Sequence, residues 1–572
     1  MFNKKQLIAI ACLSLIARGQ LLADTQVIIS SGSIIGTISD SNNIVSFKGI
    51  PFAAPPINEL RWKAPQPVTP WQETRLANEF GAQCMQNLIY DDMKFRSSGM
   101  SEDCLYLNVW APSDMRNKKR AVLLYFYGGG FVAGDGSEPR YDGASMAQKD
   151  IVVITANYRL GLFGLLAHPL LSAETPYAGS GNYTFLDQVA ALNWVVNNIE
   201  VFGGDPSRIT IAGESAGSLS VSALMASPLS RDLIAGAIGE SGSILGPPLR
   251  AVPLVTAQKK GEALFNAITA NAKSVDEKVA DAKAVDGRAV DTKVTDAKEG
   301  DTTAADTKAD DTIAADMPTL STLRKVPAEL LLSLAVEADF TWFSPTVDGY
   351  FLPVSPKELY ANNEFSKVPL LAGVNSLEAS FHDILGEKEP TIIHYTAALK
   401  RLYPDSHEQV FNLYPAKSID QVIDAAQELA SDRFISYGTY RWMDIVTQSS
   451  GKPSFYYRYQ HIRPESIDDE LPVIPSRGAT HSAEIEYVLG NLEVNKQYRW
   501  QEEDYKVSNI VQQYFANFIK FGDPNGEGLP TWPTFSENKL MTLSISPEAL
   551  STETLKERYA FHQKDLLKMD RK

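Results

Sequence analysis

The feature that most restricts the fold is an alternation of apolar, β-rich runs with helical stretches through the middle of the chain. The run 150–158 (DIVVITANY) precedes a helical stretch at 184–199, and the run 208–213 (RITIAG) precedes a second one at 216–227. Buried strands that alternate with helices form a mostly parallel sheet with helices on both faces. The sequence therefore predicts an α/β fold, with the strand-like runs before Tyr125 as antiparallel edge strands of the same sheet.

Composition and net charge narrow the class of protein. The chain has 572 residues, and 44% of them are hydrophobic, which is enough apolar material for one large core. The formal net charge of -16 argues against a nucleic acid or an anionic membrane surface as a partner. The sequence contains no clustered His and Cys pattern of a metal site, so we expect no metal and no cofactor.

The first 23 residues have the pattern of a secretory signal. Lys4 and Lys5 precede an apolar run over 7–16 that is too short to cross a bilayer, and residues 21–23 (LLA) offer a cleavage site. A lipoprotein signal that uses Cys12 is the alternative, although AIAC is a poor lipobox. No other run has the length of a membrane span. We therefore expect an exported protein, either secreted or periplasmic.

Two cysteines remain after the signal, Cys84 and Cys104. In an exported protein, two cysteines separated by 20 positions most simply form one disulfide bond, which closes the loop between them. Two buried free thiols are the alternative.

The segment 272–318 breaks the alternation. Aspartate recurs there every five residues, at Asp276, Asp281, Asp286, Asp291, Asp296, Asp301, Asp306, Asp311 and Asp316. A period of five fits neither a helix nor a strand, so no apolar face forms to offset the entropy of ordering. We interpret this segment as a disordered repeat insertion in a surface loop. Binding of calcium or of a partner is the alternative, but the glycine turn and clustered ligands of a calcium loop are missing.

The tripeptide Gly-Glu-Ser occurs twice, and only one copy has the context of a nucleophile. Ser215 lies between an apolar strand and a helix, with Gly213 two residues before it and Gly217 two residues after it. So sharp a turn needs residues without bulky side chains, and it exposes the hydroxyl at the carboxyl edge of the sheet. In the second copy, the position two residues after Ser241 is Ser243, where the pattern requires a glycine. The pattern favours Ser215, with a plain tight turn as the alternative.

A glycine-rich loop offers a site for a negative charge. An apolar strand at 121–126 runs into Gly128, Gly129 and Gly130. Consecutive glycines let backbone N–H groups turn inward without obstruction, as an oxyanion hole requires. Such a loop could instead hold a phosphate, but no GK[ST] motif accompanies it.

These motifs belong to a longer resemblance. The segment 202–217 (FGGDPSRITIAGESAG) resembles the nucleophile segment of the type-B carboxylesterase and cholinesterase family of α/β-hydrolases, and 101–110 (SEDCLYLNVW) resembles its second signature. Further matches lie at 47–62, 187–199 and 517–533. The resemblance covers 25–560 apart from the repeat segment. It implies a single α/β-hydrolase domain over 24–572, most similar to bacterial para-nitrobenzyl esterases.

The resemblance also implies a catalytic triad whose acid is a glutamate. Ser215 is the implied nucleophile, Glu378 in LLAGVNSLEASF is the acid, and His481 in THSAEIEYVLG is the base. The implied oxyanion-hole donors are the backbone N–H groups of Gly129, Gly130 and Ala216. By context alone, His168, His382 and His461 are also eligible as the base.

Two residues next to the implied triad have supporting roles. Glu214 precedes the nucleophile and is expected to tune His481 through its charge. The resemblance implies that Ser241 holds Glu378 by a hydrogen bond rather than attacking a substrate. A plain turn serine is the alternative for Ser241.

The function that the resemblance implies is a serine carboxylesterase for small-molecule carboxylic esters with short to medium acyl chains, acting through an acyl-enzyme. One alternative is a non-catalytic, cholinesterase-like binding or adhesion protein, which would typically lack a triad member. Another is a lipase for long-chain esters, with the segment 85–100 covering the site. The cholinesterase tryptophan before SEDC is replaced by Lys94 and Phe95, so a choline ester is not expected.

Overall fold

The computed structural model describes most of the chain. The described residues are 25–39, 41–270, 319–468 and 476–569. The signal segment and the repeat segment 272–318 lie outside them, so the interpretation of both stays a prediction.

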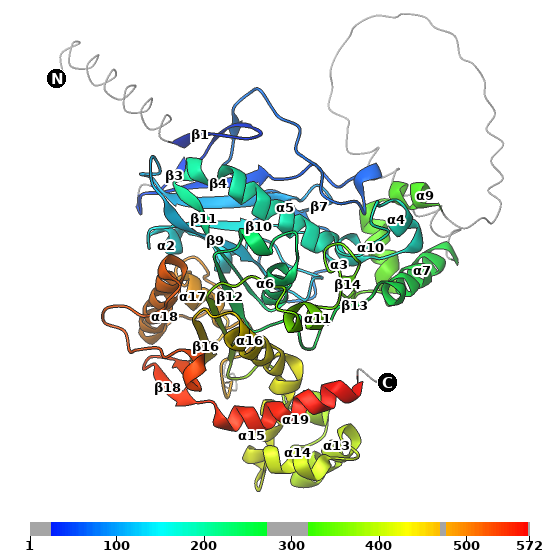
Figure 1. Ribbon diagram of the computed structural model, residues 1–572, viewed down its shortest axis with the longest axis vertical. Helices are drawn as coiled ribbons and strands as arrows, with labels where there is room; N and C mark the ends of the chain where they lie inside the picture. The colour runs from blue at the N-terminus through cyan, green and yellow to red at the C-terminus, as the bar shows by residue number, and fades with distance from the viewer. Residues whose placement is uncertain (1–24, 40, 271–318, 469–475, 570–572) are drawn as a thin grey trace, which may run out of the picture.

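An 11-stranded sheet forms the centre of the molecule (Figure 1). In spatial order its strands are β18 (Glu548–Ser551), β17 (Lys539–Leu543), β16 (Ser454–Tyr459), β15 (Leu370–Asn375), β12 (Gly236–Glu240), β11 (Gly204–Glu214), β9 (Arg120–Phe126), β10 (Ile151–Ala156), β8 (Tyr106–Pro112), β4 (Ile44–Pro51) and β3 (Thr37–Ile38). The strands from β10 to β17 are parallel, and both edges of the sheet are antiparallel. The predicted mostly parallel sheet is confirmed.

One detail of the prediction is wrong. The first hairpin, β1 (Gln26–Ile29) and β2 (Gly32–Ile35), does not join the central sheet but forms a three-stranded sheet with β5 (Arg75–Leu76). Gly36 follows β2 and lies against the ring of Phe47, where a Cβ atom would stand only 2.7 Å from that ring. After Gly36, β3 pairs with β4 and belongs to the central sheet. Two smaller pairs are β6 (Gln83–Cys84) with β7 (Met100–Ser101) and β13 (Val252–Pro253) with β14 (Thr346–Val347).

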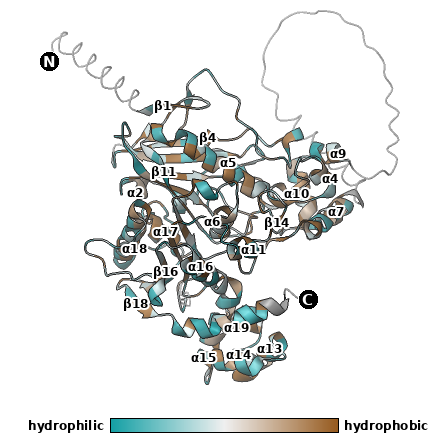
Figure 2. Cartoon of the chain, viewed as in Figure 1, coloured by the Kyte–Doolittle hydropathy of each residue, from teal (hydrophilic) through white to brown (hydrophobic). Residues whose placement is uncertain are grey.

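Helices surround the sheet. Every residue of β9 and of β10 is buried, which requires cover on both faces. The helices are α2 (Ala144–Ala147), α3 (Gly161–Leu165), α4 (Pro169–Ala173), α5 (Tyr183–Asn198), α6 (Ala216–Ala226), α7 (Leu254–Ala270), α9 (Leu320–Lys325), α10 (Ala328–Glu337), α11 (Pro356–Ala361), α12 (His382–Leu385), α13 (Ile392–Leu402), α14 (His407–Leu413), α15 (Ile419–Ser431), α16 (Tyr437–Ser449), α17 (Ile485–Leu489), α18 (Glu502–Phe521) and α19 (Glu553–Met569). The two predicted helices correspond to α5 and α6. Figure 2 shows hydrophobic and hydrophilic residues alternating along α18 and α19, as expected of helices with one face on a core.

A second, smaller core lies beside the main one. Helices α12 to α15 pack their apolar residues together with Phe561 of α19. These helices form the lower part of the molecule in Figure 1. The C-terminal helix thus connects this helical unit to the rest of the chain.

The predicted disulfide bond between Cys84 and Cys104 is present, and both residues are buried. It closes a loop that includes Tyr90, Asp92 and Met93. Within the described part of the chain, no helix combines the length and apolar character needed to cross a bilayer.

Candidate active site

Ser215 occupies the turn between β11 and α6, as the sequence predicts. Its backbone has φ 53° and ψ -116°, which is rare for a residue other than glycine. A Cβ atom at Gly217 would collide with the backbone oxygen of Phe126, so only glycine fits there. Strain of this kind costs of order 1–3 kcal/mol and is found mainly at functional sites. The turn therefore holds the Ser215 side chain in one defined place.

His481 and Glu378 are brought together by two neighbouring loops. Leu377 donates a backbone hydrogen bond to the carbonyl of Ala479 at 2.8 Å, which joins the loop after β15 to the segment before His481. Nδ1 of His481 lies 2.6 Å from Oε2 of Glu378, and the Glu378 side chain is fully buried. The imidazole is thereby fixed in orientation by a carboxylate.

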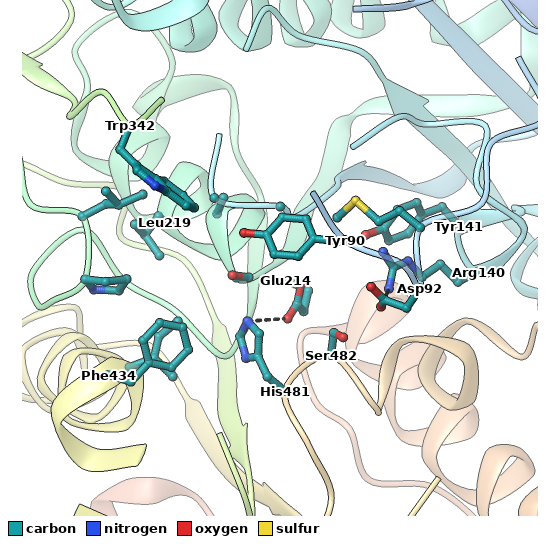
Figure 3. Close-up of a pocket in the computed structure, with 18 residues that line it drawn as sticks. Tyr90, Asp92, Arg140, Tyr141, Glu214, Leu219, Trp342, Phe434, His481 and Ser482 are labelled. Atoms are coloured by element: carbon teal, nitrogen blue, oxygen red, sulfur yellow. Dashed lines mark hydrogen bonds and ion pairs between the residues drawn. The ribbon is translucent and has the colours of Figure 1, made fainter. Parts of the chain in front are cut away.

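The other nitrogen of His481 faces Glu214. Nε2 lies 3.2 Å from Oε1 of Glu214, the contact drawn as a dashed line in Figure 3. His481, Glu214 and Ser215 all line one pocket of about 400 Å³. Ser215, His481 and Glu214 thus share one pocket, and Glu378 contacts His481 from outside its lining.

Glu378 is held by donors on its second oxygen. Oε1 accepts a hydrogen bond from the Ser241 hydroxyl at 2.6 Å and from the Asn375 backbone N–H at 2.6 Å. The backbone N–H of Glu378 donates to Oγ of Ser431 at 3.1 Å. Ser241 thus contacts Glu378, where the sequence analysis expects it.

Two neighbours of the site were missed by the sequence analysis. The Asn375 amide donates to Oε2 of Glu484 at 2.5 Å and to the carbonyl of Thr480 at 2.7 Å. Asn375 therefore links the strand that leads to Glu378 with the segment that carries His481. The sequence offered one indication of this pair: Glu484 is an acidic residue within the largely apolar stretch 483–489, which the structure shows to be buried.

The glycine loop borders the same pocket. Gly129 and Gly130 have φ values of 100° and 63°, which glycine adopts most readily. Both line the pocket together with Ala216, the first residue of α6, whose N–H has no acceptor within the helix. The three expected oxyanion-hole residues therefore line the same pocket as Ser215.

Burial and charge shift the titration of the site. Burial raises the pKa of Glu214 to about 7, although the charge of His481 acts to lower it. Burial acts to lower the pKa of His481, but the charge of Glu214 and the hydrogen bond to Glu378 outweigh it and raise this pKa to about 10. Burial also raises the pKa of Glu484 to about 8. His481 and Glu214 consequently titrate as a pair that competes for one proton.

The pocket has two unlike walls, which Figure 3 shows on opposite sides of His481. The apolar wall consists of Leu219, Pro248, Leu249, Trp342, Phe434 and Ile435. Asp92, Arg140 and Ser482 lie on the opposite side, together with Tyr141, and we call these three residues the polar wall. Tyr90 and Met93 of the disulfide loop also line the pocket.

The other eligible histidines have partners elsewhere. Nε2 of His461 lies 2.7 Å from Asp504, the ring of His168 stacks on Phe265, and Nδ1 of His382 lies 2.9 Å from the Gly386 carbonyl. None of them lines the pocket of Ser215. Among the residues that the structure describes, no group of His, Cys, Asp and Glu has the arrangement of a metal site.

The fold and the site define a class of protein, and comparison with known proteins agrees with it. The model of the carboxylesterase family matches residues 23–562, so this chain belongs to the carboxylesterase family and is a carboxylic ester hydrolase. The predicted family and the α/β-hydrolase fold are confirmed.

Particular relatives span nearly the whole chain. It is 32% identical to a fumonisin B1 esterase of Sphingopyxis macrogoltabida, over 90% of this chain and 85% of the relative. It is 33% identical to carboxylesterase 5A of Canis lupus familiaris, over 86% and 80% of the two chains, and 31% identical to the cocaine esterase of Homo sapiens, over 95% and 93%. The solved structure of a PNB esterase superposes with a TM-score of 0.72 at 27% identity, covering 94% of this chain and 99% of that one.

Proposed function

We propose that the protein is a serine carboxylesterase whose triad is Ser215, His481 and Glu378. The observation that carries the proposal is the imidazole of His481, held by Glu378 on one side and facing the pocket of Ser215 on the other. A serine hydroxyl becomes an effective nucleophile only when a positioned base takes its proton.

In the proposed reaction, Nε2 of His481 takes the proton of Ser215 as its oxygen attacks the ester carbonyl. The backbone N–H groups of Gly129, Gly130 and Ala216 stabilise the oxyanion of the tetrahedral intermediate. His481 then protonates the departing alcohol, and an acyl-enzyme remains. Water, activated by the same imidazole, attacks the acyl-enzyme and releases the acid. This chemistry needs no metal and no cofactor.

Glu378 and Glu214 have different proposed roles around His481. Glu378 fixes the ring tautomer and stabilises the imidazolium that forms, without itself taking the proton. Glu214 stabilises the same cation from the Nε2 side.

We further propose an exported, single-domain enzyme over 24–572, interrupted by the repeat segment 272–318. Helix α7 precedes this segment and α10 follows it, and the two helices pack against each other, so the fold continues across the interruption. The signal-like N-terminus and the disulfide bond support export, since such bonds persist mainly outside the cytosol.

Purified protein should hydrolyse para-nitrophenyl acetate and butyrate, and palmitate at least about tenfold less efficiently in kcat/KM. The reason is size, since a pocket of about 400 Å³ with polar groups on one wall is small for a long acyl chain. Steady-state kinetics on the three esters measure this. A folded protein that cleaves palmitate best would favour the lipase alternative, and one that cleaves none of them would contradict the proposed function.

The pH dependence of kcat/KM tests the two supporting residues. Glu214→Gln removes a charge that raises the pKa of His481, so the neutral base should form at lower pH and the acidic limb should move down by roughly 1–3 units. Ser241→Ala removes one of two donors to Oε1 of Glu378 and should lower kcat roughly tenfold, with a smaller shift of the limb. An unmoved limb in the first variant contradicts the role of Glu214. Full turnover in the second makes Ser241 a plain turn serine.

A further inference from the structure

The two walls of the pocket receive different parts of an ester. His481 must protonate the departing alcohol, and its Nε2 faces Glu214 at 3.2 Å. In Figure 3, Glu214 lies between His481 and the polar wall. The alcohol therefore leaves on the side of the polar wall. Leu219 lies one helical turn beyond Ser215 on α6 and belongs to the apolar wall. The apolar wall is then left for the acyl group.

We propose that the polar wall, Asp92 with Arg140 and Ser482, is the subsite for the alcohol and selects alcohols that carry further hydroxyl groups. The preferred substrates are then esters of a polyol or a sugar, with an apolar acyl group. This inference rests on the proposed function and names the substrate class of the same site.

The charges on the polar wall are balanced. Nη1 of Arg140 lies 3.1 Å from Oδ2 of Asp92, and Nε lies 2.8 Å from Oε2 of Glu138. Arg140 and Glu138 are almost fully buried, whereas the Asp92 side chain is 36% exposed. Burial raises the pKa of Glu138, and of the two carboxyl partners of Arg140 only Asp92 is exposed, so this wall presents the pocket with an ion pair. An ionic alcohol therefore meets no net opposite charge here.

What the polar wall offers is hydrogen bonding. The carboxylate of Asp92 has lone pairs beyond the one directed at Arg140, and the Ser482 hydroxyl both donates and accepts. A plain alkyl alcohol would cover these groups and remove their water without replacing its hydrogen bonds, which is costly. A quaternary ammonium has no hydrogen to donate, and a carboxylate would face Asp92 and Glu214. Neutral hydroxyl groups fit best.

The test compares butyrate esters that differ only in the alcohol: ethyl butyrate, glyceryl monobutyrate and butyrylcholine, with the full-length protein. We expect kcat/KM for the glyceryl ester to exceed that for the ethyl ester by roughly 10–100-fold, as one or two hydrogen bonds to a charged group allow. Butyrylcholine should be no better than ethyl butyrate. Asp92→Asn should reduce the glyceryl-to-ethyl ratio roughly tenfold.

The chain supplies a matched control in the neighbouring residue. Asp91 is exposed and does not line the pocket, so Asp91→Asn makes the same change in the same loop and should leave the ratio as in wild type. If Asp92→Asn does not fold, Ser482→Ala should lower the ratio instead.

The outcomes separate the two proposals. Equal rates for the glyceryl and ethyl esters, a preference for butyrylcholine, or equal effects of Asp91→Asn and Asp92→Asn would overturn the subsite, while ester hydrolysis itself stands. A folded protein that hydrolyses no ester would overturn the proposed function, and the subsite with it.

Discussion

Ser215→Ala is expected to lower kcat for para-nitrophenyl butyrate by roughly 10⁴–10⁶-fold, because it removes the nucleophile from a site whose residues act as a unit. The residual rate should come from the oxyanion hole and from substrate binding. Alanine occupies the same strained backbone with less bulk than serine, so the fold should persist. Circular dichroism and the midpoint of thermal unfolding check this alongside the kinetics.

The second Gly-Glu-Ser tripeptide supplies the comparison for that variant. Ser241 also has a positive φ, 53°, and is fully buried, so its replacement by alanine perturbs a similar local structure. A nucleophile role for Ser215 requires that only its own replacement abolish turnover. A fluorophosphonate, which bonds covalently to an activated serine, provides a second test. It should label wild type and Ser241→Ala but not Ser215→Ala.

Asp187→Ala is expected to lower the free energy of unfolding by about 3–5 kcal/mol, because it strands a buried guanidinium. Asp187 accepts the Arg159 side chain at 2.7 Å on each carboxylate oxygen, and also the Arg159 backbone N–H at 3.1 Å. Both side chains are almost completely buried. Thermal or urea unfolding measures the loss.

Two further variants make that prediction specific. Asp232→Ala changes an exposed aspartate and should shift stability by no more than about 0.5 kcal/mol. The double variant Arg159→Met with Asp187→Leu removes both charges and should recover much of the lost stability. If Asp187→Ala has the same free energy of unfolding as wild type, the prediction is wrong. The ion pair then contributes little to stability, and water reaches the guanidinium of Arg159.

Local signals were enough to predict the sheet and Ser215. Apolar strands such as β10 and β11 are continuous in the sequence, and the glycines around Ser215 report the turn directly. His481 is different, because its position depends on the pairing of Leu377 with the segment before it, and only the resemblance distinguished it from the other histidines. Local reasoning therefore places the turn that carries Ser215 more readily than it places His481.

Contacts between distant segments that the resemblance did not imply escaped prediction. Asp92 and Arg140 are 48 residues apart and meet only because the disulfide loop folds over the pocket. Asn375 and Glu484 are 109 residues apart, and their hydrogen bond depends on how two loops after separate strands come together. No periodicity or motif in one sequence encodes such pairs.

The disulfide loop, which carries Asp92 of the proposed alcohol subsite, is a different part of the chain from the strands that precede Ser215 and Glu378. Substitutions in this loop can therefore change substrate recognition without changing the proposed catalytic residues. Ser215 and Glu378 follow strands of the sheet, where most substitutions disturb a packed core, whereas Asp92 lies in a loop tied at both ends by Cys84 and Cys104. On the proposed assignment, mutations between the two cysteines change which esters are accepted and leave Ser215 and Glu378 untouched. For an engineer, this loop is the segment to randomise when a new ester is wanted from the same catalyst.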